Sequence, residues 1–401
     1  METSANRLNG TNSHLKRYIS VPSHPMHAET EILIIGGGLA GLTAALHLNK
    51  LGLDVTLIEK DTYPHHKVCG EYISNEVLPY LKWLGLDIES LAPALISDLL
   101  FTSLSGKSIQ TKLPLGGFGL SRYTIDHYLY TELVKRKIKV VQDRVVQVNF
   151  ANDQFVVETA TASFVAHYVI GAYGKRSAID IKLNRKFINK QSPYLAVKAH
   201  YKADFPSNVV SLHNFEGGYC GVSKVENNIL NICYLANYES FKKHKNILAY
   251  QENILYKNIH LATIFENAES MFESPLTISQ ISFEAKEPVY NHILMIGDTA
   301  GLIHPLCGNG MAMAIHSAKI VSTLLQQTLE GKITSRSALE QKYTLAWNRE
   351  FKNRLKMGRL LSALLKNNKL EKFAMDTLSK MPFMLKTIIK QTHGKPITIP
   401  Q

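Results

Sequence analysis

Apolar residues in the N-terminal part of the chain follow the pattern of a buried α/β unit. Ile32 to Ile35 form a continuous apolar run, which is typical of a strand buried on both faces. An amphipathic helix is predicted after it, with Leu42, Ala45 and Leu48 on one face. A second apolar run, Val55 to Ile58, predicts a neighbouring strand. Two buried strands joined by a helix indicate a parallel sheet.

The turn between the first strand and the helix fits the pattern G-x-G-x-x-G. Gly36 permits the tight turn, Gly38 leaves room for a pyrophosphate, and Gly41 lets the helix lie close to the strand. Glu59 ends the second strand, roughly 20 residues later, where a carboxylate accepts hydrogen bonds from ribose hydroxyls. The strand, helix and acid together predict a dinucleotide site that takes an unphosphorylated adenosine ribose.

Beyond this unit, shorter strands alternate with turn residues. Ser74 is predicted to cap a helix that runs to about Trp83, and Thr124 is predicted to cap a helix that ends at Lys135. Leu99 to Leu104 and Ser108 to Leu113 predict a hairpin. Further strands are predicted at Arg144 to Phe150, Gln154 to Thr159 and Ser163 to Ile170.

The second half of the chain predicts a large sheet followed by helices. Leu195 to Ala236 alternates as a multi-stranded antiparallel sheet does, and helical signals fill Glu239 to Ala268. Ile293 to Ile296 predicts one more buried strand, and a helix is expected from about Asn309 to Leu329. The last portion, Ala338 to Gln391, is helical in pattern, basic and rich in Leu, Met and Phe.

Composition narrows the class of protein. The 401 residues carry a formal charge of +12, yet the basic residues do not gather with aromatics into a nucleic-acid-reading module, so no nucleic-acid partner is expected. The four cysteines are scattered without metal spacing, and His65 and His66 are adjacent without further ligands, so no metal is expected. Reduced thiols, no signal peptide and no transmembrane helix predict a cytoplasmic protein.

A second motif lies at Gly297 to Met311, with the sequence GDTAGLIHPLCGNGM. Asp298 follows a buried strand, where a carboxylate can hold polyol hydroxyls. Gly308 and Gly310 open a long helix, whose N-terminus attracts negative charge. A chain with this motif as well as the first one suggests an extended flavin dinucleotide.

On these motifs the chain resembles the flavoprotein monooxygenase and geranylgeranyl reductase superfamily, with its p-hydroxybenzoate hydroxylase-like fold, over about residues 31–329. The loop Lys67 to Glu71, KVCGE, is similar to the K-x-C-G segment of the geranylgeranyl reductase-like branch. The resemblance implies FAD, with NADPH or NADH as electron donor. It implies that Asp298 contacts the ribityl chain and that Gly308, Gly310 and Met311 approach the flavin.

The same resemblance implies further contacts to the cofactor from Lys60, Lys67, Arg122 and, on the adenine side, Val145. One departure concerns Tyr173, which stands where many hydroxylases have the aspartate of a central motif and therefore puts NADPH handling by that acid in doubt. The W-x-W-x-I-P signature of flavin halogenases is absent, which disfavours a halogenase.

Three residues are candidates for catalysis, each with a competing structural role. The thiol of Cys69 could donate a proton to the substrate or could simply pack. Glu71 could bind substrate or FAD, or could be a solvated loop acid. His304 could act as an acid or base near neutral pH, or could be a packed turn histidine.

The resemblance implies an α/β fold with a Rossmann-like FAD-binding domain of the glutathione reductase type, an antiparallel β-sheet substrate domain and C-terminal helices. The expected divisions are a disordered extension at 1–30, a discontinuous FAD-binding domain at 31–75, 120–190 and 290–330, a substrate domain at 76–119 and 191–289, and a C-terminal helical region at 331–401.

The expected function is that of a FAD-dependent oxidoreductase that transfers hydride to or from an apolar or carrier-tethered organic substrate. A monooxygenase using NAD(P)H and O2, and a flavin-carrying binding or electron-transfer protein, are the alternatives. The terminal helices present a basic face that suits an anionic membrane surface or an acyl carrier protein. Its basic residues are Lys352, Arg354, Lys356, Arg359, Lys366, Lys369 and Lys372.

Overall fold

The computed structural model describes residues 27–365, 368–380 and 382–399. Within this part of the chain, the first sheet consists of β1 (His27–Ile35), β2 (Val55–Glu59), β6 (Lys139–Gln142), β7 (Val145–Ala151), β8 (Gln154–Thr159), β9 (Ser163–Gly171), β16 (Val289–Tyr290) and β17 (Ile293–Met295). Its central strands lie in the order β17-β9-β1-β2-β6 and run parallel. The predicted parallel α/β unit is therefore confirmed.

The first strand, β1, is longer than its sequence pattern indicates. Ile32, Leu33 and Ile34 are fully buried, as predicted. The strand begins at His27, and residues 27–30 pair with 163–166 of β9. The prediction of a disordered extension is therefore wrong for residues 27–30, and its residues 1–26 lie outside the described part of the chain.

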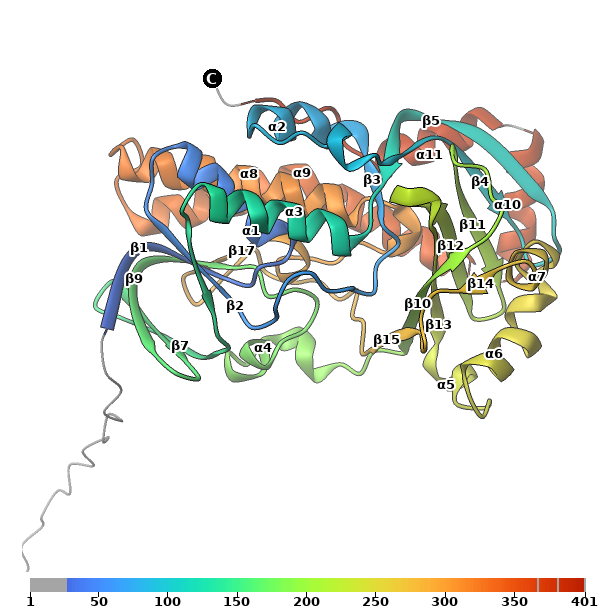
Figure 1. The fold of residues 1–401 in the computed structure, drawn as a ribbon, viewed down its shortest axis with the longest axis horizontal. Coiled ribbons are helices and arrows are strands. Elements are labelled where there is room, and N and C mark those ends of the chain that lie inside the picture. Colours follow the sequence, from blue (N-terminus) through green and yellow to red (C-terminus); the bar gives the residue numbers. More distant parts are fainter. Residues whose placement is uncertain (1–26, 366–367, 381, 400–401) are drawn as a thin grey trace, which may run out of the picture.

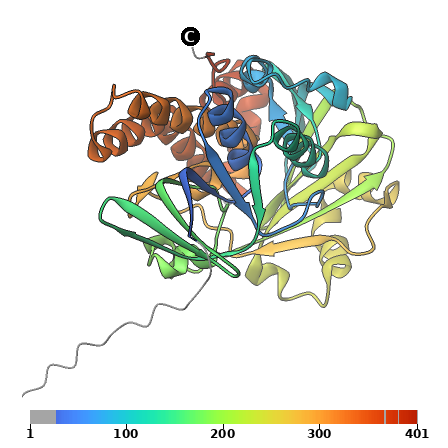
Figure 2. The ribbon, with the colours of Figure 1, turned by 60° about the vertical axis from the view of Figure 1, so that its left-hand side comes forward.

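The helices α1 (Leu39–Lys50), α3 (Arg122–Lys135), α8 (Gly310–Leu329) and α9 (Arg336–Leu365) cover the first sheet, and the short helix α4 (Ala178–Lys182) packs against β7. Helix α1 packs between α3 and α8, and α9 packs against α8 (Figure 1). Figure 2 shows α8 and α9, in orange, on one side of this sheet. Helix α3 begins earlier than predicted, because the Ser121 hydroxyl rather than Thr124 caps it and accepts from the Thr124 N–H at 3.1 Å.

The second sheet consists of β3 (Tyr72–Ser74), β4 (Ala94–Thr102), β5 (Ser108–Gly119), β10 (Tyr194–Lys202), β11 (Val209–Phe215), β12 (Gly218–Lys224), β13 (Leu230–Asn237), β14 (Glu269–Ser270) and β15 (Leu276–Ser279). It is antiparallel throughout except where β4 and β11 run parallel. The predicted hairpin of β4 with β5 and the predicted sheet over β10 to β13 are both confirmed.

The segment after β3 joins the two sheets. The Ser74 hydroxyl caps η1 (Asn75–Val77), which continues into α2 (Leu78–Trp83), so the predicted cap is confirmed. Tyr80 and Leu81 of α2 are buried in the core of the first sheet, whereas β3 belongs to the second sheet. The predicted domain boundary between residues 75 and 76 therefore differs from the structure. Residues 72–74, predicted for the FAD-binding domain, belong to the second sheet, and α2, predicted for the substrate domain, packs in the core of the first sheet.

Helices cover both faces of the second sheet. One face packs against α5 (Tyr238–Phe241), α6 (Ile247–Asn253) and α7 (Ile259–Glu266), which confirms the predicted helical segment. The other face lies toward α10 (Asn368–Lys380) and α11 (Pro382–Thr392), drawn in red in Figure 1. Helix α11 also packs along β5. The C-terminal helices therefore reach across from the first sheet, through α9, to the second.

Candidate functional site

Two glycines of the first motif have the close contacts that the pattern predicts. Gly36 has a φ of +106°, and a Cβ at this position would lie 2.5 Å from the carbonyl oxygen of Ala172. A Cβ at Gly41 would lie 1.9 Å from the carbonyl oxygen of Gly36. Side chains at either position would therefore separate the helix from the strand, as the turn geometry requires.

The space in front of Gly38 is open and faces positive charge. A Cβ at Gly38 would lie 3.7 Å from Nη2 of Arg122 and 4.0 Å from Nζ of Lys67. Asp126 holds both cations, with Oδ2 at 2.6 Å from Arg122 Nη2 and 3.1 Å from Lys67 Nζ. Burial raises the pKa of the Asp126 carboxyl, but the two cations outweigh burial and lower it. A pyrophosphate fits this arrangement of two cations and the N-terminus of α1.

The residues predicted for the adenosine end are not among the wall residues of the apolar cavity described below. Glu59 is buried, and its carboxylate accepts from the backbone N–H of Gly37 at 2.6 Å and of Asp61 at 2.9 Å. Lys60 is exposed and pairs with Asp61. Val145 is buried in the core at the start of β7. Their contacts with adenosine stay predictions, although Glu59 is anchored directly to the glycine turn.

Asp298 lies in η6 (Gly297–Thr299), directly after β17, and lines the cavity. In the described part of the chain its carboxylate has no hydrogen bond or ion pair. Its backbone carbonyl accepts from Nζ of Lys286 at 2.8 Å, and the same ammonium donates to the carbonyl of Lys175 at 2.8 Å. Burial lowers the pKa of Lys286 to about 8. The loop is thus fixed from behind while its carboxylate faces the space expected for the ribityl chain.

Arg185 supports the same loop, and no sequence motif indicated it. The side chain is fully buried and donates to Oδ1 of Asp180 at 3.0 Å and to the carbonyls of Thr299 at 2.9 Å and Glu287 at 3.0 Å. These partners are spread along the chain. Only the fold brings them together, so sequence spacing carried no signal for this arginine.

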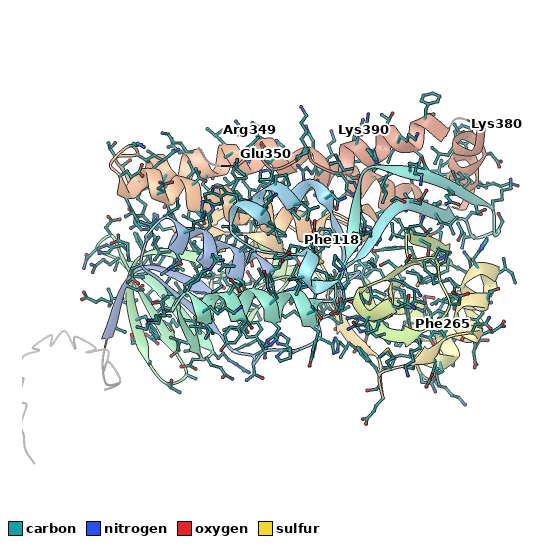
Figure 3. The ribbon with its side chains drawn as sticks, turned by 45° about the horizontal axis from the view of Figure 1, so that its top comes forward. Phe118, Phe265, Arg349, Glu350, Lys380 and Lys390 are labelled. Carbon is teal, nitrogen blue, oxygen red and sulfur yellow. The ribbon has the colours of Figure 1, made fainter. Side chains whose placement is uncertain are left out.

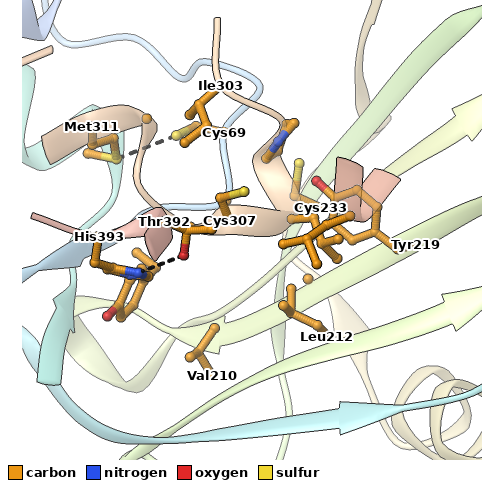
Figure 4. Close-up of a pocket in the computed structure, with 18 of the residues that line it drawn as sticks. Cys69, Val210, Leu212, Tyr219, Cys233, Ile303, Cys307, Met311, Thr392 and His393 are labelled. Carbon is orange, nitrogen blue, oxygen red and sulfur yellow. Dashed lines mark hydrogen bonds between the residues drawn. The ribbon is translucent and has the colours of Figure 1, made fainter. Parts of the chain in front are cut away.

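A cavity of about 510 Å³ extends from Gly38, Arg122 and Asp298 to the C-terminal helices. Its walls beyond the glycine turn are largely apolar and come from the second sheet and from α9 to α11. Figure 4 shows part of these walls, including strand residues and thiols. Representative wall residues are Phe101, Val210, Leu212, Leu361, Leu378 and Leu385. Such a cavity suits an apolar organic ligand.

The structure brings Cys69 together with the second motif. Sγ of Cys69 lies 3.5 Å from Sδ of Met311, as drawn in Figure 4. Gly308 has a φ of +61°, and a Cβ there would lie 3.2 Å from the ring of Tyr72. A Cβ at Gly310 would lie 3.7 Å from Ile303. Cys69, Gly308, Gly310 and Met311 all line the cavity, so the loop after β2 and the second motif lie at the same cavity.

Glu71 is fixed by its neighbours. It is 1% exposed, and its carboxylate accepts from Nζ of Lys198 at 2.7 Å, from Nε2 of His200 at 2.7 Å and from the backbone N–H of Arg122 at 2.8 Å. Burial raises the pKa of Glu71, but hydrogen bonds from His200 and the charge of Lys198 lower it overall. A carboxylate that is ionised and held on both oxygens suits a positioning role. The catalytic role stays a prediction.

His304 packs among aromatic rings beside the cavity. Its ring centroid lies 4.6 Å from that of Phe283, 5.7 Å from that of Tyr219 and 6.4 Å from that of Tyr194. The residues on either side, Ile303 and Pro305, line the cavity, whereas His304 is not among the wall residues. The packing role weighed for this histidine fits the geometry, and its acid or base role stays a prediction.

No sequence motif indicated several residues that line the cavity. Nζ of Lys175 donates to the carbonyl of Val68 at 3.2 Å and thereby holds the Cys69 loop. Cys233 and Cys307 are free thiols that line the same cavity as Cys69. Their positions in separate strands and turns gave no local pattern.

Two further searches concern membranes and metals. Across residues 27–365, 368–380 and 382–399, no helix is long and apolar enough to cross a bilayer. The same residues contain no group of three His, Cys, Asp or Glu side chains arranged to hold a metal ion.

A comparison with known families shows the family to which the chain belongs. Residues 29–344 match the family described as FAD binding domain, a span that includes Gly38, Arg122 and Asp298. The chain belongs to this family. FAD is accordingly the cofactor of this chain, and the protein is a FAD-dependent oxidoreductase. Contacts of FAD with Gly38, Arg122 and Asp298 stay predictions.

Proteins similar to this chain include a reductase, a monooxygenase and a halogenase. Digeranylgeranylglycerophospholipid reductase 2 of Methanosphaera stadtmanae is 22% identical over 79% of this chain and 83% of that protein. A FAD-dependent monooxygenase of Penicillium janthinellum is 23% identical over 78% of this chain and 71% of that protein. A tryptophan 2-halogenase of Chondromyces crocatus also matches, with 64% of its length covered.

A solved structure of a geranylgeranyl bacteriochlorophyll reductase-like protein from Thermoplasma acidophilum shares the fold. Its TM-score is 0.73 at 18% identity, with 91% of this chain and 97% of that chain covered. At this identity the likeness establishes the fold alone. The predicted α/β flavoprotein fold and the predicted resemblance are thus confirmed.

Gly38→Ala is expected to weaken FAD binding by roughly 10 to 100-fold, because overpacking of this kind costs about 1–3 kcal/mol. The added methyl group has space in the protein itself, 3.7 Å from Arg122, so it acts on the cofactor rather than on the fold. Flavin absorbance per protein and titration of the apoprotein with FAD measure the effect. Unchanged affinity, with unchanged thermal unfolding of the apoprotein, would contradict the assignment. Gly41→Ala should instead lower stability, since its Cβ meets a carbonyl.

Proposed function

We propose that this FAD-dependent oxidoreductase transfers hydride to or from an apolar or carrier-tethered organic substrate held in the cavity. The observation that carries the proposal is the continuity of the cavity, which begins at Gly38 and Arg122, passes Cys69 and Met311, and ends between apolar side chains of α9 to α11. A ligand in the apolar part would therefore lie next to the cofactor site and away from bulk water.

Different residues of this chain bind the cofactor, orient the substrate and donate a proton in the proposed reaction. FAD supplies the redox chemistry when bound. Arg122 and Lys67 offer positive charge to the pyrophosphate, and Asp298 offers hydrogen-bond acceptors to the polyol chain. The apolar walls orient the substrate and exclude water, while Cys69 offers a proton donor at the wall between cofactor site and substrate space.

The monooxygenase alternative is supported by the relatives, since a monooxygenase and a reductase match this chain at similar identity. The electron-transfer alternative is disfavoured by the cavity, because a protein without an organic substrate does not require apolar walls beyond its cofactor site. We propose NADPH or NADH as the electron donor, as the family resemblance implies.

Anaerobic mixing with NADPH or NADH is expected to bleach the flavin absorbance of the purified holoenzyme. Admission of O2 then separates the two reactions, because a reductase passes its electrons to an apolar alkene without O2, whereas a monooxygenase requires O2 for product. Product analysis after incubation with a long-chain alkene, with and without O2, provides the measurement. Oxygenated product that forms only with O2 would favour the alternative.

We propose Cys69 as the proton donor that accompanies hydride transfer, because reduction of a double bond consumes one hydride and one proton. The Sγ–H bond of Cys69 breaks as the new C–H bond forms, and solvent restores the thiol. Cys69→Ala is expected to slow turnover by about 100-fold, the low end for a positioned general acid, while FAD still binds. Cys233→Ala and Cys307→Ala, which remove thiols from the same walls, are the matched controls and should have little effect. If Cys69→Ala turns over substrate as fast as Cys233→Ala and Cys307→Ala do, Cys69 is not the proton donor.

We also propose an anionic membrane as the partner of the C-terminal helices, in a protein that is otherwise cytoplasmic. The exposed apolar side chains of these helices include Phe373 at 71% and Phe383 at 60% exposure. Helices α9 and α10 also carry exposed cations, at Lys352, Lys356, Arg359, Lys369 and Lys372. Basic residues beside exposed aromatic rings suit the surface of a bilayer. Arg354 does not belong to this face, because it is buried and pairs with Glu76, and Lys366 lies outside the described residues.

The protein is expected to sediment with vesicles that contain phosphatidylglycerol and to stay in the supernatant with phosphatidylcholine alone. The double variant Phe373→Ser and Phe383→Ser should lose most of this binding, whereas Leu248→Ser, which changes an exposed leucine of α6, should not. Fractionation of expressing cells checks the cytoplasmic location. Sedimentation that ignores lipid charge would contradict the proposal, and capture by an acyl carrier protein instead would favour the other partner.

A further inference from the structure

A second hollow, of about 790 Å³, lies beside the first cavity and has a different character. It lies between the end of β5, helices α8, α9 and α11, and the tail at residues 394–398. Figure 3 labels Arg349, Glu350 and Lys390, which lie along this side of the molecule and line the hollow. We call it the basic groove, because Lys319, Arg349, Lys390 and Lys395 line it.

The basic groove and the apolar cavity share walls. Tyr72, Leu113, Ile389 and His393 line both. The ring of Tyr72 faces the position of a Gly308 Cβ, 3.2 Å away on the cavity side, and its hydroxyl donates to the carbonyl of Gly116, a groove residue, at 3.3 Å. A single extended ligand bound across this boundary would therefore have its two ends in surroundings of opposite polarity.

Cations outnumber acids in the basic groove. Among its described wall residues Glu350 is the acid, and it pairs with Arg349 at 3.2 Å, which leaves the charges of Lys319, Lys390 and Lys395. A further wall residue, Arg354, is neutralised by buried Glu76 at 3.1 Å. Among the described wall residues, the groove thus presents more positive than negative charge.

Burial and the nearby cations lower the pKa values of two titratable groups in the groove, His316 and Lys319. Burial and the nearby cations lower the pKa of His316 to about 3, so the imidazole is neutral. Burial and Arg349 lower the pKa of Lys319, although Glu350 raises it. Nδ1 of His316 is buried and, among the described residues, lacks a hydrogen-bond partner. An anion in the groove would relieve the repulsion among these groups.

We propose that the basic groove binds the anionic end of an amphiphilic substrate whose hydrocarbon part lies in the apolar cavity. The inference rests on the proposed function of that cavity and adds the chemical class of the substrate. The shared boundary, the unmatched cations of the groove and the apolar walls of the cavity carry it together. A neutral hydrocarbon would make no ionic contact with the groove, and a small anion would not fill the apolar cavity.

The test uses the full-length holoenzyme and three probes: dodecyl phosphate below its micellar concentration, dodecanol and inorganic phosphate. Perturbation of the flavin absorbance and calorimetry report binding. Dodecyl phosphate is expected to bind at least tenfold more tightly than dodecanol, and inorganic phosphate far more weakly than either. The dodecanol arm reports on the cavity alone, so failure of the proposed function is visible separately from failure of the groove.

Variants locate the headgroup. Lys319→Gln and Lys390→Glu are each expected to weaken dodecyl phosphate by about tenfold and to leave dodecanol unchanged. Lys386→Glu, on the same helix as Lys390 but outside the groove, is the matched control and should change neither. Equal affinity for dodecyl phosphate and dodecanol in the wild type would overturn the proposal. So would inorganic phosphate that binds as tightly as dodecyl phosphate, because the groove would then act as an independent anion site.

Discussion

The buried carboxylate of Glu71 is the constraint on which the site depends. Its backbone has a left-handed φ of 55°, and its oxygens accept hydrogen bonds from Lys198 and His200 of the second sheet and from the first residue of α3. Ions removed from water cost several kcal/mol each unless they are paired and hydrogen-bonded. The two lobes are therefore held in one relative position at the point where the Cys69 loop enters the cavity.

A second carboxylate strengthens this junction and extends it to the cofactor. Glu226, on the turn between β12 and β13, accepts from the backbone N–H of Ser121 at 2.8 Å and from the hydroxyl of Thr124 at 2.6 Å. The start of α3 is thus bound to the second sheet. The start of this helix also carries Arg122 and Asp126, and the Asp126 carboxylate holds the cations of Arg122 and Lys67 in front of Gly38. The start of α3, Glu71 and the second sheet are thus parts of one polar network, which restrains their movement relative to one another.

The parts of the fold that the sequence predicted well are those that local physics decides. Apolar runs predicted β1 and β2, and the spacing of Gly36, Gly38 and Gly41 predicted the tight turn before α1. Both patterns depend on residues that are close together in the sequence. The partners of Glu71 and Arg354 were out of reach, since Lys198 is 127 residues from Glu71 and Glu76 is 278 residues from Arg354. Isolated charged residues show no period, so only the folded chain reveals which of them pair.

The leucines of α9 have two roles, because they pack against the core of the first sheet and line the cavity. Leu361 packs against the core of the first sheet, and it also lines the cavity together with Leu364 and Leu365. An apolar cavity offers water few hydrogen-bond partners, so it favours an apolar occupant. Polar surroundings lie at both limits of this space, at Arg122 on one side and at the basic groove on the other. Because Arg122 and the cations of the basic groove lie at different limits of this space while the walls between them are largely apolar, the space matches a ligand that is polar at its ends and apolar in its middle.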